Sequence, residues 1–301
     1  MVTGGAGFIG SHFVEKLVTQ GYGVRVLDDL SAGSLNNIAG HIKSGSVDFV
    51  KGDIRDSAVV ADCLVDVGVV VHFAALTSVT FSVANPDLTF DVNARGTLNL
   101  VNACVKQTVD KFVFVSSCAV YGDPKRMPVA ETCPTNPISP YAESKLSGER
   151  YCLTADDSGL LKSVVLRFFN VYGPRQTLND YSGVITRFKD CVRQNKPLIV
   201  YGDGLQTRDF VNVRDIVEAV LLAVRCDEAQ GEVFNIGSGK PTSITELAKT
   251  ILKLADVDLK ISYEKPREGD IRDSYADISK ARKVLGYNPE VDLENGLKGL
   301  I

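Results

Sequence analysis

The stretch Thr-Gly-Gly-Ala-Gly-Phe-Ile-Gly at residues 3–10 contains two overlapping glycine patterns. Gly5, Gly7 and Gly10 form Gly-x-Gly-x-x-Gly, and Gly4, Gly7 and Gly10 form Gly-x-x-Gly-x-x-Gly. Such glycines allow a tight turn and a close backbone approach to a pyrophosphate, and Gly10 lets a helix pack near a strand. A helix beginning near Phe8 directs unpaired N–H groups and a positive dipole end at such an anion. The stretch therefore predicts a phosphate-binding turn between a strand and a helix.

The sequence after this turn supplies the context that a glycine triplet alone lacks. A helical pattern follows at Ser11–Gln20, and the next strand ends in Asp28-Asp29, at the interval of about twenty residues that is typical of dinucleotide-binding folds. Asp28 would hydrogen-bond the adenine ribose, and its charge would repel the 2′-phosphate of NADP. The pattern therefore predicts NAD as the cofactor. The alternative interpretation is that Asp28 is a surface acid that ends a strand.

Apolar runs rich in Val, Ile and Phe alternate with helical patterns through the first half of the chain. Continuous apolar strands in this alternation are typical of a parallel sheet covered by helices on both faces. Strands are expected at Gly23–Leu27, Val47–Val50, Val67–Ala74, Lys111–Ser116 and Val164–Phe169, and helices at Ser11–Gln20, Asn85–Gln107 and Ala142–Ala155. The predicted fold class is α/β, a doubly wound parallel sheet (Rossmann) with a smaller mixed α/β substrate lobe.

The alternation changes after Gly173-Pro174, where we place the main boundary. Residues 1–173 are expected to form the NAD-binding domain, to which 209–237 return, while 174–208 and 238–301 form the substrate-binding lobe. Helices are expected at Val184–Asn195 and Asp215–Arg225, a glycine-rich turn at 201–204, strands at Glu232–Ile236 and Leu259–Tyr263, and short helices from Thr242 onward. In open α/β sheets the ligand binds in the crevice at the carboxyl ends of the strands, so the site is expected there.

Composition argues against several other classes of protein. The chain has 301 residues, of which 45% are hydrophobic and 23% charged, and its formal net charge of −4 argues against nucleic acid as the main partner. No apolar run is long enough to span a bilayer, so a cytoplasmic protein without a membrane partner is expected. The three histidines are scattered, which predicts no metal site. Because the glycine turn begins at Gly4 and the chain stops inside a helical pattern, we expect both ends of a longer protein to be missing.

Two copies of Tyr-x-x-x-Lys occur, at Tyr121 and Lys125 and at Tyr141 and Lys145. A four-residue spacing places both side chains on one face only where the segment is helical. The first copy contains Gly122 and Pro124, so it is expected to be a turn with a structural Tyr121. The second copy follows Pro140 and opens a helical pattern. We therefore predict that Tyr141 and Lys145 are the functional pair.

These residue types suit proton transfer at neutral pH. An unperturbed tyrosine has a pKa of about 10, so only about one in a thousand is ionised at pH 7. A Tyr141 acting as a general base needs that pKa lowered, and we expect the Lys145 ammonium and a positive nicotinamide ring to lower it. Ser116-Ser117 ends a strand, where a hydroxyl can reach the reacting oxygen. The alternative for these serines is that they only end the strand in a turn.

These motifs, together with His72 to Ala75, the run from Ser116 to Gly122 and the run from Arg167 to Pro174, resemble the extended short-chain dehydrogenase/reductases. Within them the chain is most similar to the UDP-glucose (UDP-galactose) 4-epimerases. The resemblance covers essentially the whole chain and implies that Ser117, Tyr141 and Lys145 are catalytic, with Lys145 also holding the nicotinamide ribose. It implies that NAD is bound by Gly4, Gly7, Phe8, Ile9, Gly10, Asp28, Asp29, Leu30, Ser31, Gly33, Asp53, Ile54, Phe73, Ala74, Ala75, Asn93, Ser117, Tyr141, Lys145 and Phe169.

The resemblance also implies a UDP-sugar substrate and a set of residues that hold it. Arg208 and Arg267 suit a diphosphate, because the planar guanidinium fork binds oxygens bidentately. The alternative for Arg208 is a surface ion pair with Asp209. The implied substrate contacts are Thr77, where the family often has Lys, together with Ser117, Tyr141, Asn170, Val184, Tyr201, Arg208, Arg267, Asp270 and Ser274.

The resemblance implies a 4-epimerase reaction. Tyr141 takes the 4-hydroxyl proton while the sugar passes a hydride to NAD⁺, the 4-keto sugar turns over, and the hydride returns to its other face. Relatives that dehydrate or decarboxylate carry acidic residues where this chain has Cys118 and Ala119, which weakens those interpretations. Two alternatives stay open: another sugar-nucleotide epimerase, reductase or dehydratase of the family, and a non-catalytic NAD-sensing protein.

Two finer expectations come from the same resemblance. A small residue at Ser274 is similar to members that accept N-acetylhexosamines, so UDP-GlcNAc and UDP-GalNAc are expected as substrates beside UDP-Glc and UDP-Gal. If Tyr275 instead of Ser274 corresponds to this position of the family, the resemblance implies that only the plain hexoses are accepted. The family commonly forms homodimers, and the helices at Asn85–Gln107 and Ala142–Ala155 are the candidates, with apolar faces that include Leu98, Val101, Leu146 and Tyr151. The alternative is that these faces cover the sheet of the same chain, so the homodimer rests on the resemblance.

Overall fold

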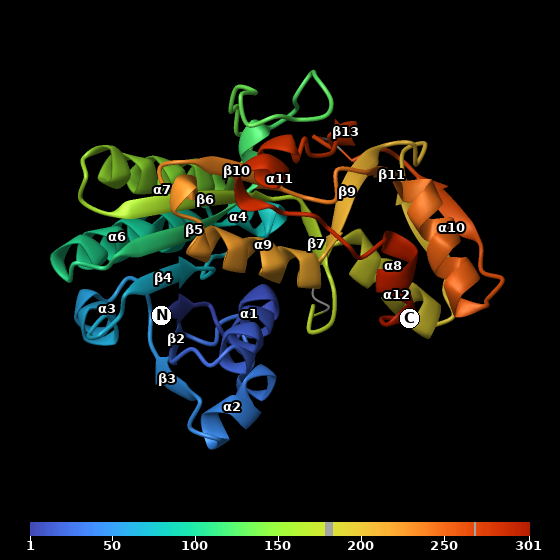
Figure 1. The fold of residues 1–301 in the computed structure, drawn as a ribbon. Helices are drawn as coiled ribbons and strands as arrows, with labels where there is room; N and C mark the ends of the chain where they lie inside the picture. Colours follow the sequence, from blue (N-terminus) through green and yellow to red (C-terminus); the bar gives the residue numbers. More distant parts are fainter. Residues whose placement is uncertain (178–182, 268) are drawn as a thin grey trace.

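A seven-stranded sheet forms the centre of the larger part of the molecule (Figure 1). The computed structural model describes residues 1–177, 183–267 and 269–301. The strand order is β10-β6-β5-β4-β1-β2-β3, and all neighbours in this sheet are parallel. The strands are β1 (Val2–Thr3), β2 (Val24–Asp28), β3 (Val47–Lys51), β4 (Val69–His72), β5 (Lys111–Ser117), β6 (Lys162–Phe168) and β10 (Val233–Ile236). The doubly wound Rossmann fold is therefore confirmed.

Helices cover both faces of this sheet. α1 (Phe8–Thr19) and α9 (Val213–Arg225) contact each other on one face, and α3 (Ser57–Cys63), α6 (Gly96–Lys106) and α7 (Pro140–Asp157) cover the other. In β5, Val113 and Val115 belong to one core cluster, and Phe112 and Phe114 belong to the other core cluster. Alternate residues of a strand point to opposite faces, so a strand buried on both sides needs apolar residues throughout.

The crossing from one half of the sheet to the other defines where a ligand can bind. From β1 the chain winds outward to β2 and β3, and it then returns to β4 beside β1 and winds outward the other way to β5 and β6. A crevice opens outside the carboxyl ends of the strands at such a switch point. The glycine turn follows β1 directly, so it lies at this point.

Short helices and one irregular helix complete the larger part. The helix predicted for 85–107 is α5 (Pro86–Phe90), a π-helical turn at Asp91–Arg95 and then α6. The remaining helices here are α2 (Ala39–Lys43) and α4 (Val79–Ala84). None of the helices in the described ranges is both long and apolar enough to cross a bilayer.

The second lobe lies to one side of the large sheet, near the C-terminus in Figure 1. Its helices are α8 (Val184–Arg193), α10 (Ile244–Ala255) and α12 (Leu293–Lys298), whereas α11 (Ser279–Leu285) contacts β10 and α9 of the larger part. One small sheet contains β7 (Asn170–Tyr172), β9 (Thr207–Asn212), β11 (Pro241–Ser243) and β13 (Asp273–Ser274), and another pairs β8 (Leu198–Tyr201) with β12 (Ile261–Glu264). The sequence predicted only the last of these strands.

Two of the four residues expected to face a partner subunit lie inside the single chain. Val101 is 3% exposed and Leu146 is 5% exposed, and each belongs to a core cluster of the larger part. That part of the expectation is wrong, because these apolar positions of α6 and α7 are used in the chain's own core. Leu98 and Tyr151 are half-buried. The homodimer itself stays a prediction.

Candidate functional site

The turn at residues 4–10 has the geometry of an anion cradle. Gly4 has a φ of +67°, in the left-handed region that favours glycine. Gly7 is the N-cap of α1, no side chain in the described part of the chain caps it, and the first turn of α1 contains no acid. The first N–H groups of α1 are therefore free of a side-chain partner. These features fit the diphosphate of a dinucleotide, and Gly4, Gly7, Phe8, Ile9 and Gly10 would line it.

Gly10 could not be exchanged for a larger residue without moving this turn. A Cβ atom built at Gly10 would lie 2.2 Å from the carbonyl oxygen of Gly4 and 2.9 Å from its carbonyl carbon. Both contacts are with backbone, so no side-chain rotation relieves them. The third glycine is thus required for the close packing of α1 on the turn, as the sequence predicted.

Asp28 ends β2 beside the turn. Its carboxylate accepts hydrogen bonds from the backbone N–H of Ala6 at 2.9 Å and of Leu30 at 2.8 Å. The side chain is buried, and burial raises its pKa, while these two backbone N–H donors lower it. The alternative of a surface acid is therefore wrong, because the carboxylate is held in the crevice. A carboxylate has further acceptor sites for ribose hydroxyls.

The residues after β2 wrap around the glycine turn. Gly33 packs on it, since a Cβ at Gly33 would lie 2.9 Å from the carbonyl carbon of Ala6. Asp29 instead accepts a hydrogen bond from the backbone N–H of Ser31 at 2.8 Å, which folds the loop on itself. Thus Leu30 contacts Asp28 and Gly33 contacts the glycine turn, whereas Asp29 and Ser31 contact each other.

The residues after β4 complete the walls near the turn. A Cβ at Gly4 would lie 2.7 Å from the backbone nitrogen of Ala74 and 3.1 Å from the carbonyl carbon of Phe73, so these segments touch. Asn93, in the π-helical turn, is buried and exchanges hydrogen bonds with the backbone of Leu76 at 2.8 and 2.9 Å. Its amide also donates to Ser144 at 3.1 Å, which connects this wall to α7.

Asp53 and Ile54 follow β3, the edge strand next to β2. Asp53 forms an ion pair with Arg55, and the hydrogen bond from Arg55 lowers the pKa of its carboxyl group. Ile54 packs against α6, since a Cβ at Gly96 would lie 2.6 Å from its terminal methyl group. Both residues lie at the carboxyl end of their strand, as the ligand crevice requires.

The structure brings Ser117 and Tyr141 together. Ser117 is the last residue of β5, and Tyr141 is the second residue of α7, whose N-cap Ser139 accepts from the backbone N–H of Ala142 at 3.2 Å. The Ser117 hydroxyl lies close enough to Tyr141 to lower the pKa of its phenol. Tyr141 is 8% exposed, so this pair lies at the closed end of the site. A substrate oxygen placed between the two hydroxyls would meet both.

Lys145 lies one turn after Tyr141 but is directed elsewhere. Its ammonium donates to the carbonyl oxygen of Val115 at 2.8 Å and lies 5.0 Å from the centre of the Phe114 ring. Burial lowers the pKa of Lys145 to about 8, while the neighbouring Cys152 and Glu149 raise it. The helical spacing is as predicted, and the backbone of β5 holds the ammonium.

Burial dominates the electrostatics of Tyr141 in the chain alone. Burial raises the pKa of Tyr141 to about 12, while the nearby Ser117 hydroxyl lowers it. In the chain alone this pKa is not below its ordinary value, and the lowering expected from Lys145 together with a positive nicotinamide ring stays a prediction. The reason for the raised pKa is desolvation, which disfavours the phenolate, combined with the engagement of Lys145 at Val115.

Cys118 connects the catalytic end of the site to the second lobe. Burial raises the pKa of its thiol to about 11, while the nearby Ser274 and Ser117 lower it. Ser274 is buried in β13 and is the register partner of Arg208 in β9. The structure thus places Ser274 beside the pair of Ser117 and Tyr141, although 100 or more residues separate them in sequence.

Four residues predicted to hold the substrate gather in the second lobe. Arg208 donates to the Asp270 carboxylate at 2.5 Å, and the Arg267 guanidinium lies 3.8 Å from the centre of the Tyr201 ring. The alternative pairing of Arg208 with Asp209 is wrong, because Asp209 is buried and accepts four hydrogen bonds from Ser238, Gly239 and Ala276. Two guanidinium groups and an aromatic ring therefore face one region.

Five other predicted residues lie in several different segments of the chain. Asn170 begins β7 and is exposed, Val184 begins α8, and Thr77 is exposed in the loop before α4. Phe169 is buried after β6, and Ala75 is half-buried after β4. Their positions are at the carboxyl ends of strands or in the second lobe, and their roles stay predictions.

Sequence reasoning missed two residues at this site. Gln206 donates to the carbonyl oxygen of Tyr201 at 2.8 Å and to Asp270 at 3.4 Å, so it braces two predicted substrate contacts. The signal was its position two residues before Arg208 at the start of a strand, which places both on one face. Glu149 is buried one turn after Lys145, and the four-residue helical spacing would have placed it on the catalytic face.

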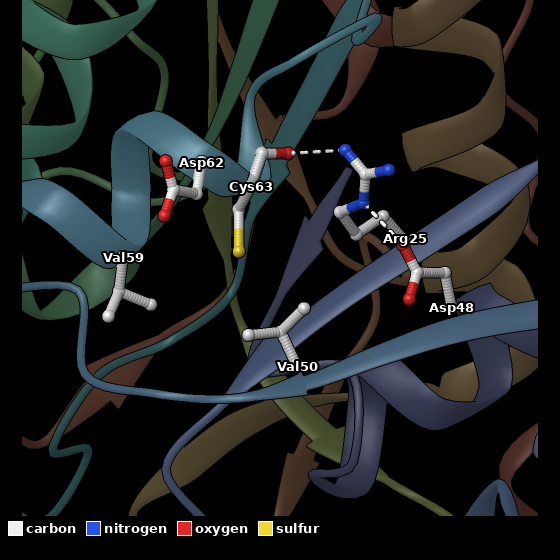
Figure 2. Close-up of a pocket in the computed structure, with 6 residues that line it drawn as sticks. All are labelled: Arg25, Asp48, Val50, Val59, Asp62 and Cys63. Carbon is white, nitrogen blue, oxygen red and sulfur yellow. Dashed lines mark hydrogen bonds and ion pairs between the residues drawn. The ribbon is translucent and has the colours of Figure 1, made fainter.

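Figure 2 shows a pocket that does not belong to this site. Arg25 lies in it and donates to Asp48 at 2.6 Å and to the carbonyl oxygen of Cys63 at 3.1 Å. Arg25 is the second residue of β2, so the pocket lies at the amino end of the sheet. Asp28 and the glycine turn lie at the opposite, carboxyl end.

Comparison with known proteins agrees with this geometry. Residues 1–237 match the model of the family described as NAD dependent epimerase/dehydratase. The chain is 43% identical to a putative UDP-glucose 4-epimerase of Methanocaldococcus jannaschii, covering 100% of this chain and 96% of that protein.

Solved structures extend the comparison. A UDP-glucose 4-epimerase of Thermotoga maritima with UDP-glucose has a TM-score of 0.93 at 40% identity, covering 99% of this chain and 95% of that one. A UDP-N-acetylglucosamine 4-epimerase of Methanobrevibacter ruminantium M1, in complex with UDP-N-acetylmuramic acid, has a TM-score of 0.94 at 37% identity, covering 99% and 94%. Sugar-nucleotide decarboxylases and dehydratases also match, at 33–34% identity.

Proposed function

This chain belongs to the NAD dependent epimerase/dehydratase family, and from that premise we propose that it interconverts UDP-hexoses that differ at C4. The observation that carries the proposal is that the end of β5 places Ser117 next to the buried Tyr141, with Cys118 and Ala119 following Ser117 directly. This pair can hold and exchange the proton of one sugar hydroxyl. The neighbouring thiol, with its pKa raised to about 11, and a methyl group supply no second acid for elimination or loss of carbon dioxide.

In this proposal each group has a defined task. Tyr141 takes the proton of the 4-hydroxyl and later returns it, and Ser117 orients the same oxygen. When bound, NAD⁺ accepts and returns a hydride, and its positive ring favours the ionised form of Tyr141. Lys145 holds the cofactor ribose through donors that are not used by Val115, since an ammonium has three. Arg208 and Arg267 hold the diphosphate, with Asp270 fixing the first of them.

The electrostatics explain why the proton transfer needs the complete holoenzyme. The chain's own residues place the pKa of Tyr141 at about 12, which is far above neutral pH. A general base works best when its pKa is near the working pH. A positive charge next to the hydroxyl is therefore required before Tyr141 can take a proton.

The test is an assay of the purified protein without added NAD. Incubation with UDP-Gal, UDP-GalNAc and a dTDP-hexose is expected to yield the C4 epimers of the UDP-sugars, detected by NMR of the sugar ring. Activity without added cofactor is expected, because the hydride is returned and the cofactor remains oxidised. Turnover only with stoichiometric NADH would instead identify a reductase, and loss of water or carbon dioxide would identify the other branches of the family.

We also propose that N-acetylated sugars are accepted, because the wall residue Ser274 is small and lies near Cys118. Ser274→Tyr is expected to lower kcat/KM for UDP-GalNAc by about 100-fold while changing that for UDP-Gal by no more than a few fold, since discrimination by size in a pocket is of this order. Ser274→Ala, which keeps the residue small, serves as the control and should retain both activities. Equal losses on both sugars in the tyrosine variant would contradict the proposal.

A further inference from the structure

A continuous row of buried hydrogen bonds runs beneath the site, and the proposed reaction does not use it. Ser116 donates to Glu149, whose carboxylate forms a bidentate pair with Arg167, at 2.9 Å to Nε and 2.6 Å to Nη2. Arg167 Nη1 donates to the Tyr121 hydroxyl at 2.9 Å, and this hydroxyl donates to the Asn235 side chain at 2.7 Å. We name these five residues the buried polar row. All five are buried in the single chain.

One end of the buried polar row lies under the catalytic groups. Ser116 precedes Ser117 in β5, and Glu149 follows Lys145 by one turn of α7. The contact of Ser116 with Glu149 therefore joins the two elements that carry Ser117 and Tyr141. Lys145 makes a second tie between the same elements through Val115, but this ammonium is also the group assigned to the cofactor ribose.

The other end reaches the segment that follows Ser274, the residue proposed to limit the size of the sugar. Asn235 donates to the carbonyl oxygen of Val129 at 2.8 Å. The backbone of Val129 accepts from Asp277 at 2.8 Å and donates to Tyr275 at 2.9 Å, in the segment that follows Ser274. The row thus connects α7 and β5 to the strand that carries Ser274.

Stability alone does not account for such an arrangement. Moving two charges out of water is costly, and replacing a buried ion pair by apolar residues of similar volume is often neutral or stabilising. Directional hydrogen bonds, in contrast, restrict the relative positions of the elements they join. A displacement of about 1 Å at reacting groups can cost about 100-fold in rate.

We infer that Glu149, Arg167 and Tyr121 are positioning residues, which hold β5, α7 and β13 so that Ser117 and Tyr141 meet one substrate oxygen. The inference rests on the proposed function for the substrate, and on the geometry of the chain for the positioning. Tyr121 thereby has a role beyond filling the core, because its hydroxyl accepts a hydrogen bond from Arg167 and donates one to Asn235.

The first test compares two tyrosines that are buried to the same degree. Tyr121→Phe removes the hydroxyl in the middle of the row, and Tyr287→Phe removes a hydroxyl that donates to the carbonyl oxygen of Gly237 at 2.9 Å. Both variants are expected to lose similar amounts of Tm. Only Tyr121→Phe is expected to lower kcat, by about 10-fold, with KM for the UDP-sugar changed less than threefold. Equal kcat values in the two variants would overturn the inference.

The second test removes the ion pair without leaving a buried charge. Glu149→Leu/Arg167→Met leaves no charge of the row buried, so Tm is expected to stay near that of the parent, while kcat falls by at least 10-fold. The holoenzyme should also lose NAD on dialysis about 10-fold faster, because α7 and Lys145 are less firmly held. Recovery of Tm together with parental kcat and NAD retention would show that the pair is only structural.

The NAD measurement separates this inference from the proposed function. If the parent chain does not epimerise any UDP-sugar, the proposed function fails, and the dialysis rate still decides whether the row positions α7. Parental NAD retention in the double variant would then overturn the inference. If the double variant does not fold, the kcat of Tyr121→Phe relative to that of Tyr287→Phe decides it.

Discussion

Tyr141→Phe is expected to lower kcat for UDP-sugar epimerisation by about 1,000-fold, within the range that positioned acid–base groups contribute. The change removes one hydroxyl and keeps the ring that is buried between β5 and α7. Because Arg208 and Arg267 are proposed to hold the substrate through its diphosphate, KM should change by no more than a few fold. The measurement is the initial rate of UDP-Gal conversion at saturating substrate.

The matched control is Tyr151→Phe, which makes the same change on the same helix, ten residues away and half-buried. It should retain parental kcat. If Tyr141→Phe kept more than one tenth of the parental rate, the hydroxyl would not be the base. Unchanged biological function of that variant would favour the interpretation of the protein as a non-catalytic NAD sensor.

Gly10→Ala is expected to abolish stable NAD binding and to lower the free energy of unfolding. The added methyl group would lie 2.2 Å from the Gly4 carbonyl oxygen and 3.0 Å from the Gly5 Cα atom. Overpacking of this kind costs about 1–3 kcal/mol, and here relief requires moving α1 away from the turn that holds the diphosphate. We expect Tm to fall by several degrees and the NAD content of the purified protein to fall by at least 100-fold.

Gly40→Ala provides the control for this prediction. Gly40 lies in α2, and no atom beyond its chain neighbours lies within 4 Å of a Cβ built there. Alanine is a better helix former than glycine by about 1 kcal/mol, so this variant should be as stable as the parent or more stable. NAD retention by Gly10→Ala equal to that of Gly40→Ala would contradict the assignment of the turn.

The strands of the large sheet could be predicted because strands that are buried on both faces are rich in apolar residues. β2, β3, β5 and β6 are rich in Val, Leu and Phe, and each observed bound lies within two residues of the predicted one. The strands of the second lobe were not predictable in this way. β9 reads Thr-Arg-Asp-Phe-Val-Asn, with charged residues that are accommodated only because Asp209 receives four hydrogen bonds from distant segments.

Tyr141 and Lys145 also show which features could be predicted from the sequence and which could not. The sequence distinguished Tyr141 from Tyr121 through Pro140 and Pro124, because proline opens a helix but breaks one from within. It did not show that the Lys145 ammonium is held by the carbonyl oxygen of Val115, nor that burial raises the pKa of Tyr141 to about 12. Both depend on which groups of β5 lie against α7.

The sequence by itself therefore determined the parallel sheet, the glycine turn after the first strand and the preference for NAD, and it predicted the catalytic side chains. These are local properties, set by apolar periodicity, by glycines at fixed spacing and by helix start signals. Only the tertiary structure decided the proximity of Cys118 to Ser274 and the contacts of Arg208 with Asp270 and of Glu149 with Arg167. Their partners come from distant segments, and hydrogen bonds and pKa values depend on distances and burial that exist only after the chain has folded.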